Sequence, residues 1–236
     1  MKVTENTKVR DKVLSALKRE RFTPKTFSVT GLVMCPRRTY YRMKGEKEVG
    51  QENVTLVLTR GRALHKELGG AFKLTEIHRE ADGIRGDIDA VEDNVIEFYT
   101  TNLSLKNVAD INKVSEVFKI KVRQLMAYCY MTKERVGDLL VLFMSGDYSR
   151  YTEIIGKKYY TGIQPVLKCW TLEFTEDELK ENWKKILSNK EDIEYALKTG
   201  MPPLTAGEEF ECNNCGYSYI CFGEEPVTEA VQGDIK

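Results

Sequence analysis

Three cysteines near the C-terminal end constrain the fold of this chain more than any other feature. The segment ECNNCGYSYICF places Cys212, Cys215 and Cys221 in a C-x2-C-x5-C array. Three thiols so close along a chain rarely serve only as core residues, and ligation of a metal or an iron–sulfur cluster is the default interpretation. Three ligands require a fourth, so the fold has to bring another side chain to this tail.

Cys35 is the best candidate for the fourth ligand. It lies in FSVTGLVMCPRRTYYRMKG, residues 27–45, whereas Cys129 and Cys169 belong to apolar patterns typical of a buried helix and a strand. A site closed by Cys35 would join an N-terminal helix to the C-terminal tail. Four thiolates suit Zn²⁺ as well as an iron–sulfur cluster, so both remain open here.

Composition places the chain among folded globular proteins. Its 236 residues can bury a sizeable core as one domain, or as one domain with a smaller appendage, and 42% are hydrophobic. The 36 basic and 36 acidic residues cancel, so a nucleic-acid surface would have to be a local basic patch. No leader or membrane-spanning run is visible, and the longest strongly apolar run is LLVLFM at 139–144. We therefore expect a cytoplasmic protein without disulfides.

A β-hairpin is predicted in the middle of the chain. The segment GIRGDIDAVEDNVIEFYTT, residues 83–101, has two runs rich in β-branched residues around Asp93-Asn94. Asp89 and Glu97 lie near the strand ends, where alternation would point both to one face. Paired carboxylates can hold a hard divalent cation through oxygen ligands, and an exposed acidic hairpin is the alternative.

Two elements precede this hairpin and each contains a histidine. Residues 51–73 predict a helix with His65 inside it, and residues 72–80, FKLTEIHRE, predict a strand leading into the hairpin. If the helix packs across the sheet, His65 can complete the metal shell, and an imidazole shifts the preference from Mg²⁺ toward Mn²⁺. A satisfied structural histidine is the alternative. We interpret His78 as a strand-surface residue with no role.

A long helix is predicted after the hairpin, at residues 113–135, followed by a buried central strand at 138–145. Lys121, Gln124 and Tyr128 are spaced i, i+3 and i+7, so they share one face of this helix. That polar face would overhang whatever the sheet presents, and the edge of an ordinary surface helix is the alternative. A helix between two strands indicates a βαβ crossover.

The remaining segments predict packing elements and one further hairpin. Residues 147–174 alternate tyrosines with short strand-like runs, and KKYY at 157–160 combines charge with aromatic rings, as a grip on single-stranded nucleic acid would require. A plain hairpin loop is the favoured interpretation there. Further helices are predicted at residues 7–20, from a cap at Ser28 or Thr30 to about Met43, and at residues 175–199.

Taken together, these segments resemble the CRISPR-associated, RecB-like iron–sulfur exonucleases, the "Cas four" family of the PD-(D/E)XK nuclease superfamily. The resemblance runs from about Ser28 to Phe222 and rests on six motifs whose order and spacing match the family. The motifs are LVMCPRRTYY with Cys35, GRALH with His65, GDID with Asp89, VIE with Glu97, RQLMAY with Gln124 and Tyr128, and the tail cysteines Cys212, Cys215 and Cys221.

This resemblance implies an α/β fold: a PD-(D/E)XK, restriction-endonuclease-like mixed sheet flanked by helices, with a small helical iron–sulfur subdomain formed by both termini. Residues 1–60 would form an N-terminal helical region that contributes one cluster cysteine. Residues 61–200 would form the nuclease core, and residues 201–236 the C-terminal cluster segment.

The resemblance also implies a function. The family trims DNA ends, acting as a metal-dependent exonuclease or endonuclease, and takes part in acquiring CRISPR spacers for antiviral defence together with integrase proteins. DNA, single-stranded or with a free end, would be the partner, and a homo-oligomer stays open. By this likeness a 4Fe–4S cluster would be bound by Cys35, Cys212, Cys215 and Cys221, and Mn²⁺ or Mg²⁺ by His65, Asp89, Glu97 and the carbonyl of Phe98, with Gln124 and Tyr128 lining the site.

Arginines beside these motifs are candidate phosphate clamps, because guanidinium groups pair well with phosphate oxygens. They are Arg37, Arg38, Arg60, Arg62 and Arg123.

One position departs from the family pattern. The family's E-x-K motif has a lysine two residues after the glutamate, where this chain has Tyr99. A phenol is neutral near pH 7 and supplies no cation to offset charge developing on a phosphate. Either Lys121 takes over the role of that lysine, or the chain is a catalytically weakened DNA-binding or CRISPR-interfering protein, as a virus-encoded relative would be. We favour the first.

Overall fold

The structure, a computed structural model, describes residues 7–17, 24–49, 52–148, 151–154, 156–160, 162–213 and 215–223. The chain divides into two compact units. One comprises Met1–Lys25, Met34–Ala63 and Glu191–Lys236, and so draws on both ends of the chain; the other comprises Thr26–Val33 and Leu64–Lys190. The segment boundaries predicted at residues 60 and 200 stay a prediction.

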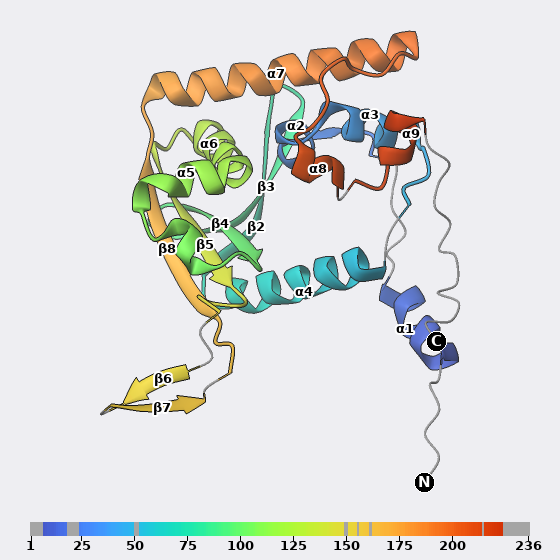
Figure 1. Ribbon diagram of the computed structural model, residues 1–236. Helices are drawn as coiled ribbons and strands as arrows, with labels where there is room; N and C mark the ends of the chain where they lie inside the picture. The colour runs from blue at the N-terminus through green and yellow to red at the C-terminus, as the bar shows by residue number, and fades with distance from the viewer. Residues whose placement is uncertain are drawn as a thin grey trace. The chain divides into compact units, whose positions relative to one another are not determined.

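A six-stranded mixed sheet forms the centre of the second unit (Figure 1). The predicted mixed sheet flanked by helices is confirmed. The predicted hairpin forms its middle, and the apolar run after it becomes a central strand that lies parallel to one neighbour and antiparallel to the other. The strands are β1 Phe27–Ser28, β2 Leu74–Ala81, β3 Ile84–Val91, β4 Val95–Thr101, β5 Val136–Phe143 and β8 Val166–Glu173, in the order β1-β3-β4-β5-β8 with β2 also paired to β3.

Strand β3 has an unusual set of neighbours. Strand β2 pairs with it from Ile84 to Val91 except at Asp89, so β1 and β4 must share the opposite edge. There β1 meets only Ile84 and Arg85, while β4 meets only Ala90 and Val91. The stretch of β3 between these two contacts therefore diverges from β4, and side chains rather than a paired strand fill the gap.

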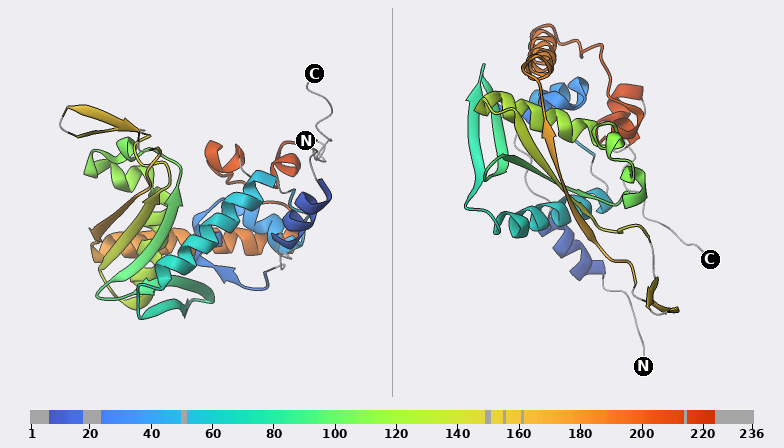
Figure 2. Two further views of the ribbon diagram at one scale, coloured as in Figure 1. Left: turned by 90° about the horizontal axis from the view of Figure 1, so that it is seen from below. Right: turned by 90° about the vertical axis from the view of Figure 1, so that its left-hand side faces the viewer.

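Helices cover both faces of the sheet (Figures 1 and 2). Helix α6, Lys119–Thr132, lies between β4 and β5 along the chain, and these two strands are parallel, so the predicted βαβ crossover is confirmed. The last turns of α4, Glu52–Gly69, bring Leu68 to the other face. There Leu68 and Phe72 pack against a cluster of buried residues: Ala90, Ile96, Phe98 and Leu140.

The continuous helix predicted from residue 28 or 30 to Met43 is wrong. The segment contains α2, Val29–Val33, and α3, Pro36–Lys44, with a break at Met34 and Cys35. Proline lacks an N–H and restricts the preceding residue to extended backbone, so Pro36 starts a new helix and Cys35 has ψ 119°. The predicted cap by Ser28 holds, since its hydroxyl accepts a hydrogen bond from the N–H of Gly31 at 3.2 Å.

The single helix predicted at residues 113–135 is also interrupted. Its first turn is a separate helix, α5 Val114–Val117, and α6 starts after Phe118, whose φ of −109° and ψ of 29° are not helical. The Phe118 ring packs against Tyr99, Phe143 and Trp170, so burial of this ring outweighs helix continuity. Two short 3₁₀ helices precede α5, η1 Leu105–Val108 and η2 Ile111–Lys113.

The other predicted elements agree with the structure where it describes them. Helix α1 spans Thr7–Leu17, and residues 18–20 of its prediction lie outside the described residues. Strands β6 Tyr151–Ile154 and β7 Lys157–Tyr160 form the expected separate hairpin. Helix α7, Glu176–Thr199, starts with Thr175 and Glu178 bonding each other's backbone N–H groups. In the tail, α8 is Glu209–Asn213 and α9 is Ser218–Phe222.

In the part of the chain that the structure describes, no helix combines the length and apolar character needed to cross a membrane.

We predict that Gly137 cannot be enlarged without loss of stability. A Cβ at this position of β5 would lie 2.8 Å from Leu125 Cδ1 and 3.0 Å from Cys129 Sγ on α6. Overpacking a full core typically lowers stability by about 1–3 kcal/mol. Chemical denaturation should therefore rank the free energies of unfolding as wild type, then Gly137→Ala, then Gly137→Val. Equal values for all three proteins would contradict the close approach of α6 to β5.

Candidate functional site

The gap between β3 and β4 contains Asp89. Its carboxylate oxygen Oδ2 accepts a hydrogen bond from the backbone N–H of Phe98 at 2.8 Å. Where the two strands have separated, this side chain replaces a strand carbonyl as the acceptor for that N–H. The other oxygen, Oδ1, lies 3.4 Å from Nδ1 of His65 on α4. The His65 ring also meets the Phe98 ring edge-on, with centroids 5.7 Å apart. The structure thus brings His65, Asp89 and the backbone of Phe98 together.

Glu97, on the neighbouring strand, faces helix α6. Its side chain is 1% exposed, and Oε1 accepts a hydrogen bond from Lys121 Nζ at 2.6 Å. Its other oxygen accepts from Gln124 Nε2 at 3.3 Å, and Gln124 also binds Lys121 and the hydroxyl of Tyr128. The spacing of these three residues predicts one shared helix face, and this closed set of hydrogen bonds confirms that they share it.

Lys121 lies above the position where the family motif has its lysine. Its Nζ is 5.5 Å from the centroid of the Tyr99 ring, and Tyr99 follows Glu97 by two residues on β4. Residues i and i+2 of a strand lie on the same face, so a lysine at position 99 would approach Glu97 from the same side. The ammonium group of Lys121 contacts Glu97 at this place, although it comes from a different element.

Burial and charge shift the acidities of this cluster. Burial raises the pKa of Glu97 to about 7, although the Lys121 ammonium acts in the opposite direction. Burial lowers the pKa of Lys121, but the Glu97 carboxylate more than compensates, and the net pKa of Lys121 is raised. Burial and then Glu97 raise the pKa of Tyr128, which therefore stays a neutral phenol. Near neutral pH the Glu97–Lys121 pair carries an ammonium group beside a carboxyl group that titrates.

Thr30 belongs to the same cluster, although the sequence patterns did not indicate it. Its hydroxyl hydrogen-bonds to the side chain of Tyr128, the end of the network that starts at Glu97. Thr30 lies on α2, directly after the short strand β1 that pairs with the start of β3. Its S-x-T spacing with Ser28 indicated only a helix cap, because nothing local links it to α6.

The donor atoms at this site suit a hard divalent cation: two carboxylates, an imidazole and a backbone carbonyl. Lys121 already binds one oxygen of Glu97, and Phe98 N–H binds one of Asp89. Among the residues that the structure describes, no three His, Cys, Asp or Glu side chains are arranged closely enough to hold a metal ion. The site is therefore a set of suitable ligands close together, not a closed metal shell.

The cysteines of the predicted cluster site lie together in the first unit. Burial raises the pKa of Cys212, and the neighbouring thiols of Cys35 and Cys221 raise it further. Burial also raises the pKa of Cys215, and the same two thiols act on it, while Arg38 works against them. Cys35 and Cys221 thus lie within electrostatic range of both Cys212 and Cys215. The absence of a metal-binding group of three His, Cys, Asp or Glu side chains among the described residues covers these cysteines too.

The remaining two cysteines are placed as the sequence patterns predict. Cys129 is fully buried on α6 and Cys169 lies on β8, and both belong to the second unit.

The arginines proposed as phosphate clamps differ in their contacts. Arg37 donates to the carbonyls of Pro203 and Leu204, and Arg123 donates to the carbonyl of Val33. Both guanidinium groups therefore bind backbone groups distant in the sequence and stabilise the fold. Arg38 is 3.8 Å from Glu48. Arg62 is exposed on α4, one turn before His65, and its guanidinium group donates to the hydroxyl of the neighbouring Thr59 at 2.9 Å. Arg60, two residues earlier, lies on the same helix.

His78 lies apart from this cluster, on the surface of β2. Its imidazole contacts Asp87 at 2.5 Å, and Arg85 contacts the same carboxylate at 2.8 Å. Asp87 is thus engaged on the sheet surface, whereas Asp89, two residues later, turns into the strand gap.

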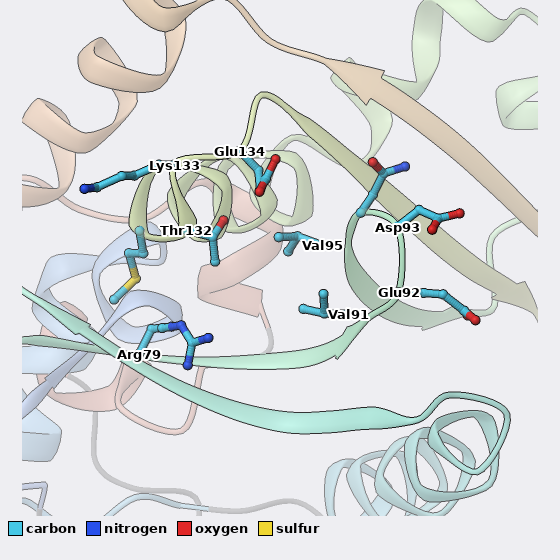
Figure 3. A pocket seen from close by; sticks show the side chains of 10 residues that line it. Arg79, Val91, Glu92, Asp93, Val95, Thr132, Lys133 and Glu134 are labelled. Carbon is cyan, nitrogen blue, oxygen red and sulfur yellow. The ribbon is translucent and has the colours of Figure 1, made fainter.

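A cavity of about 360 Å³ lies elsewhere in the second unit. Figure 3 shows its lining side chains, which come from the β3–β4 turn, the end of α6 and β2. Cationic and anionic side chains both line it, and none belongs to the cluster around Glu97. Its lining residues are Arg79, Val91, Glu92, Asp93, Asn94, Val95, Met131, Thr132, Lys133 and Glu134.

The fold is similar to that of SSO0001. The two structures match with a TM-score of 0.54 at 20% sequence identity, over 90% of this chain and 96% of that one. The alkaline exonuclease LHK-Exo from Laribacter hongkongensis gives a TM-score of 0.43 at 13% identity, covering 80% of this chain and 95% of that one. A phage-related exonuclease from Haemophilus somnus 129PT gives 0.49 at 11%, covering 75% and 96%. No family model and no curated protein sequence matches the chain.

We predict that Glu97 makes the stability of the metal-free protein depend on pH. A carboxyl group whose pKa rises from 4.5 to about 7 on folding binds its proton more tightly in the folded state. Its contribution is fully present below pH 4.5 and is lost as pH rises through 7, a decrease on the order of 3 kcal/mol. Denaturation in EDTA should show this decrease for wild type and not for Glu97→Gln. The exposed Glu67→Gln variant is the control, and an unchanged slope in Glu97→Gln would contradict the burial effect.

Proposed function

We propose that this chain is a metal-dependent deoxyribonuclease, an exonuclease or endonuclease that hydrolyses phosphodiester bonds. The observation that carries the proposal is the pairing of Lys121 with buried Glu97 beside Asp89 and His65. Carboxylates and an imidazole next to a lysine are the groups that metal-assisted phosphodiester hydrolysis uses. They come from four separate elements, α4, β3, β4 and α6, and only the tertiary fold brings them together.

Asp89, Glu97, His65 and the carbonyl of Phe98 would hold Mn²⁺ or Mg²⁺. When bound, such a cation polarises a phosphate oxygen and lowers the pKa of a coordinated water. Asp89 is kept in place by the N–H of Phe98, and Glu97 by Gln124. Both acids are therefore oriented by contacts that do not depend on the cation.

Lys121 would supply the positive charge that Tyr99 lacks. The Glu97 side chain is 1% exposed and the Lys121 side chain is 22% exposed, so Lys121 is the partner that keeps access to solvent. Its ammonium group can offset negative charge that develops on a phosphate during hydrolysis. The Tyr99 ring beneath Nζ and the Gln124 carbonyl oxygen at 3.2 Å hold it in that position.

Arg62 is the best placed of the candidate phosphate clamps, because its guanidinium group is exposed one helical turn before His65. Arg38 and Arg60 are further candidates. Arg37 and Arg123 would have to give up backbone carbonyls to bind DNA, so we assign them to the fold.

A 4Fe–4S cluster bound by Cys35, Cys212, Cys215 and Cys221 is part of the proposal. When bound, it would cross-link the N-terminal and C-terminal segments of the first unit. The grouping of four thiols supports a thiolate-bound metal, and the family resemblance selects the iron–sulfur cluster over zinc. Processing of CRISPR spacer precursors with integrase proteins is a narrower proposal that rests on that resemblance alone.

We predict that Asp89→Asn abolishes cleavage of end-labelled DNA in Mn²⁺. A lost metal ligand should reduce the rate more than about a hundredfold, the upper range for loss of a residue that only supports a ligand. Asp87→Asn is the matched control, since it changes an exposed acid two residues earlier on the same strand. Full activity of Asp89→Asn would remove the proposed site. DNA binding by wild type without cleavage in any divalent metal would instead favour a weakened, DNA-binding relative.

We predict that Lys121→Met lowers the cleavage rate by about 10²- to 10³-fold, as expected for loss of a group that stabilises transition-state charge. The double variant Lys121→Met with Tyr99→Lys should recover part of this rate, because both positions face Glu97 from one side. Lys119→Met, on the same helix, is the control. Undiminished cleavage by Lys121→Met would mean that Lys121 does not replace the motif lysine.

A further inference from the structure

Glu211 connects the two distant segments that carry the cysteines. Its Oε1 accepts a hydrogen bond from the backbone N–H of Cys35 at 3.0 Å, across 176 residues of sequence. Its Oε2 accepts from the backbone N–H of Glu208 at 3.1 Å, in the turn that leads into α8. One carboxylate thus binds the N-terminal cysteine and the C-terminal segment at once.

Gly207 shows how closely these segments approach. A Cβ at this position would lie 2.8 Å from Cys35 Cβ, 3.2 Å from Cys35 Sγ and 3.1 Å from Glu211 Oε2. Contacts below 3.0 Å require something to shift, and the nearest atom is the first carbon of a buried side chain rather than the end of a flexible one. Any residue larger than glycine at 207 would therefore push Cys35 away from Glu211.

The tail cysteines are attached to the same frame. The N–H of Cys212 bonds to the carbonyl of Glu208, and the N–H of Cys215 bonds to the carbonyl of Cys212. The hydroxyl of Tyr41 hydrogen-bonds to the thiol of Cys221, and the Tyr41 ring stacks on Tyr217 with centroids 6.0 Å apart. Protein groups therefore hold the backbone of Cys35, Cys212 and Cys215 and the thiol of Cys221.

The charge of Glu211 makes its position informative. The Glu211 carboxylate adds a like charge beside Cys212 and raises the pKa of that thiol, which opposes formation of the thiolate that a metal needs. Arg37 and Arg38 lie near the tail thiols and offset part of this repulsion. Because the charge of Glu211 opposes thiolate formation, we look for its role in its contacts. Its two hydrogen bonds to backbone N–H groups indicate that it positions the cysteine segments.

We propose that Glu211 is a positioning residue that holds Cys35 against the tail cysteines before any metal is bound. Each oxygen of the carboxylate accepts a charge-assisted hydrogen bond, one from each cysteine segment. The two segments are therefore already held together when the metal binds. Preorganisation of this kind lowers the entropy lost on binding. The inference rests on the proposed function only for the identity of the metal that the thiols bind.

The first experiment uses the metal-free full chain and measures how fast Cys35 forms disulfides with the tail cysteines. Diamide takes two electrons and two protons from a pair of thiols, forming one S–S bond and a hydrazine, and mass spectrometry counts the Cys35-to-tail products. Glu211→Ala should slow their formation at least about tenfold, as expected for loss of a charged hydrogen-bond acceptor. Glu209→Ala, an acid on the same short helix, is the matched control and should leave the rate unchanged.

Two further variants cover the case in which Glu211→Ala fails to fold. Glu211→Gln keeps one acceptor oxygen and should slow the reaction less than Glu211→Ala. Gly207→Ala keeps Glu211 but displaces Cys35, and should slow the reaction as well. Disulfide rates equal to wild type in folded Glu211→Ala, or in both Glu211→Gln and Gly207→Ala, would overturn the proposal.

The second experiment measures metal uptake after anaerobic reconstitution, with iron, sulfide and zinc counted per chain and the brown colour read by absorbance. Glu211→Ala should bind less cluster than wild type and Glu209→Ala, with Cys35→Ser as the positive control for loss. Two results together would separate the proposals: slower disulfide formation in Glu211→Ala, and zinc or no metal in the reconstituted wild type. The first would support the positioning role, and the second would contradict the iron–sulfur part of the proposed function. Normal disulfide rates with a normal brown cluster in Glu211→Ala would overturn the positioning role alone.

Discussion

The hydrogen bond between the Glu97 carboxylate and the Lys121 ammonium group is the interaction on which the second unit depends most. Glu97 lies on a central strand and is almost completely buried, and an unpaired charge there would destabilise the fold strongly. Lys121 offsets that charge only if α6 lies across β4 with one particular face turned inward. The same orientation brings Gln124 and Tyr128 to the site. The pair that makes the buried acid tolerable therefore also sets the position of the helix.

The divided edge of β3 is the second requirement. A fully paired hairpin would bond the N–H of Phe98 to a strand carbonyl, and the Asp89 carboxylate would lose this donor. Because β1 and β4 each pair with only two residues of β3, the middle of this strand is open to side chains. The Asp89 carboxylate takes the N–H of Phe98 and meets His65 from α4. An interruption in backbone pairing is thus what allows two acids from adjacent strands and an imidazole to meet.

The thiol site follows the same logic with different groups. Its candidate ligands come from two segments far apart in the chain. Glu211 and the close approach at Gly207 join them through backbone atoms. At both sites protein groups locate the candidate ligands without help from a metal. Each site places a carboxylate near other groups that can carry negative charge, which destabilises it. Nearby cations reduce this repulsion: Lys121 at one site, and Arg37 and Arg38 at the other.

The sequence by itself determined the type and order of most elements, because alternation and helical periodicity are local properties of a chain. It also determined which residues are candidates: the cysteine array, the two acids of the hairpin, and the face shared by Lys121, Gln124 and Tyr128. Only the tertiary structure decided that Lys121 contacts Glu97 above Tyr99, and that Thr30 and Glu211 belong to the sites. It likewise decided the helix breaks at Cys35 and Phe118, where a proline and a buried ring prevail over periodicity. Contacts between residues distant in the chain leave no local pattern, so packing alone reveals them.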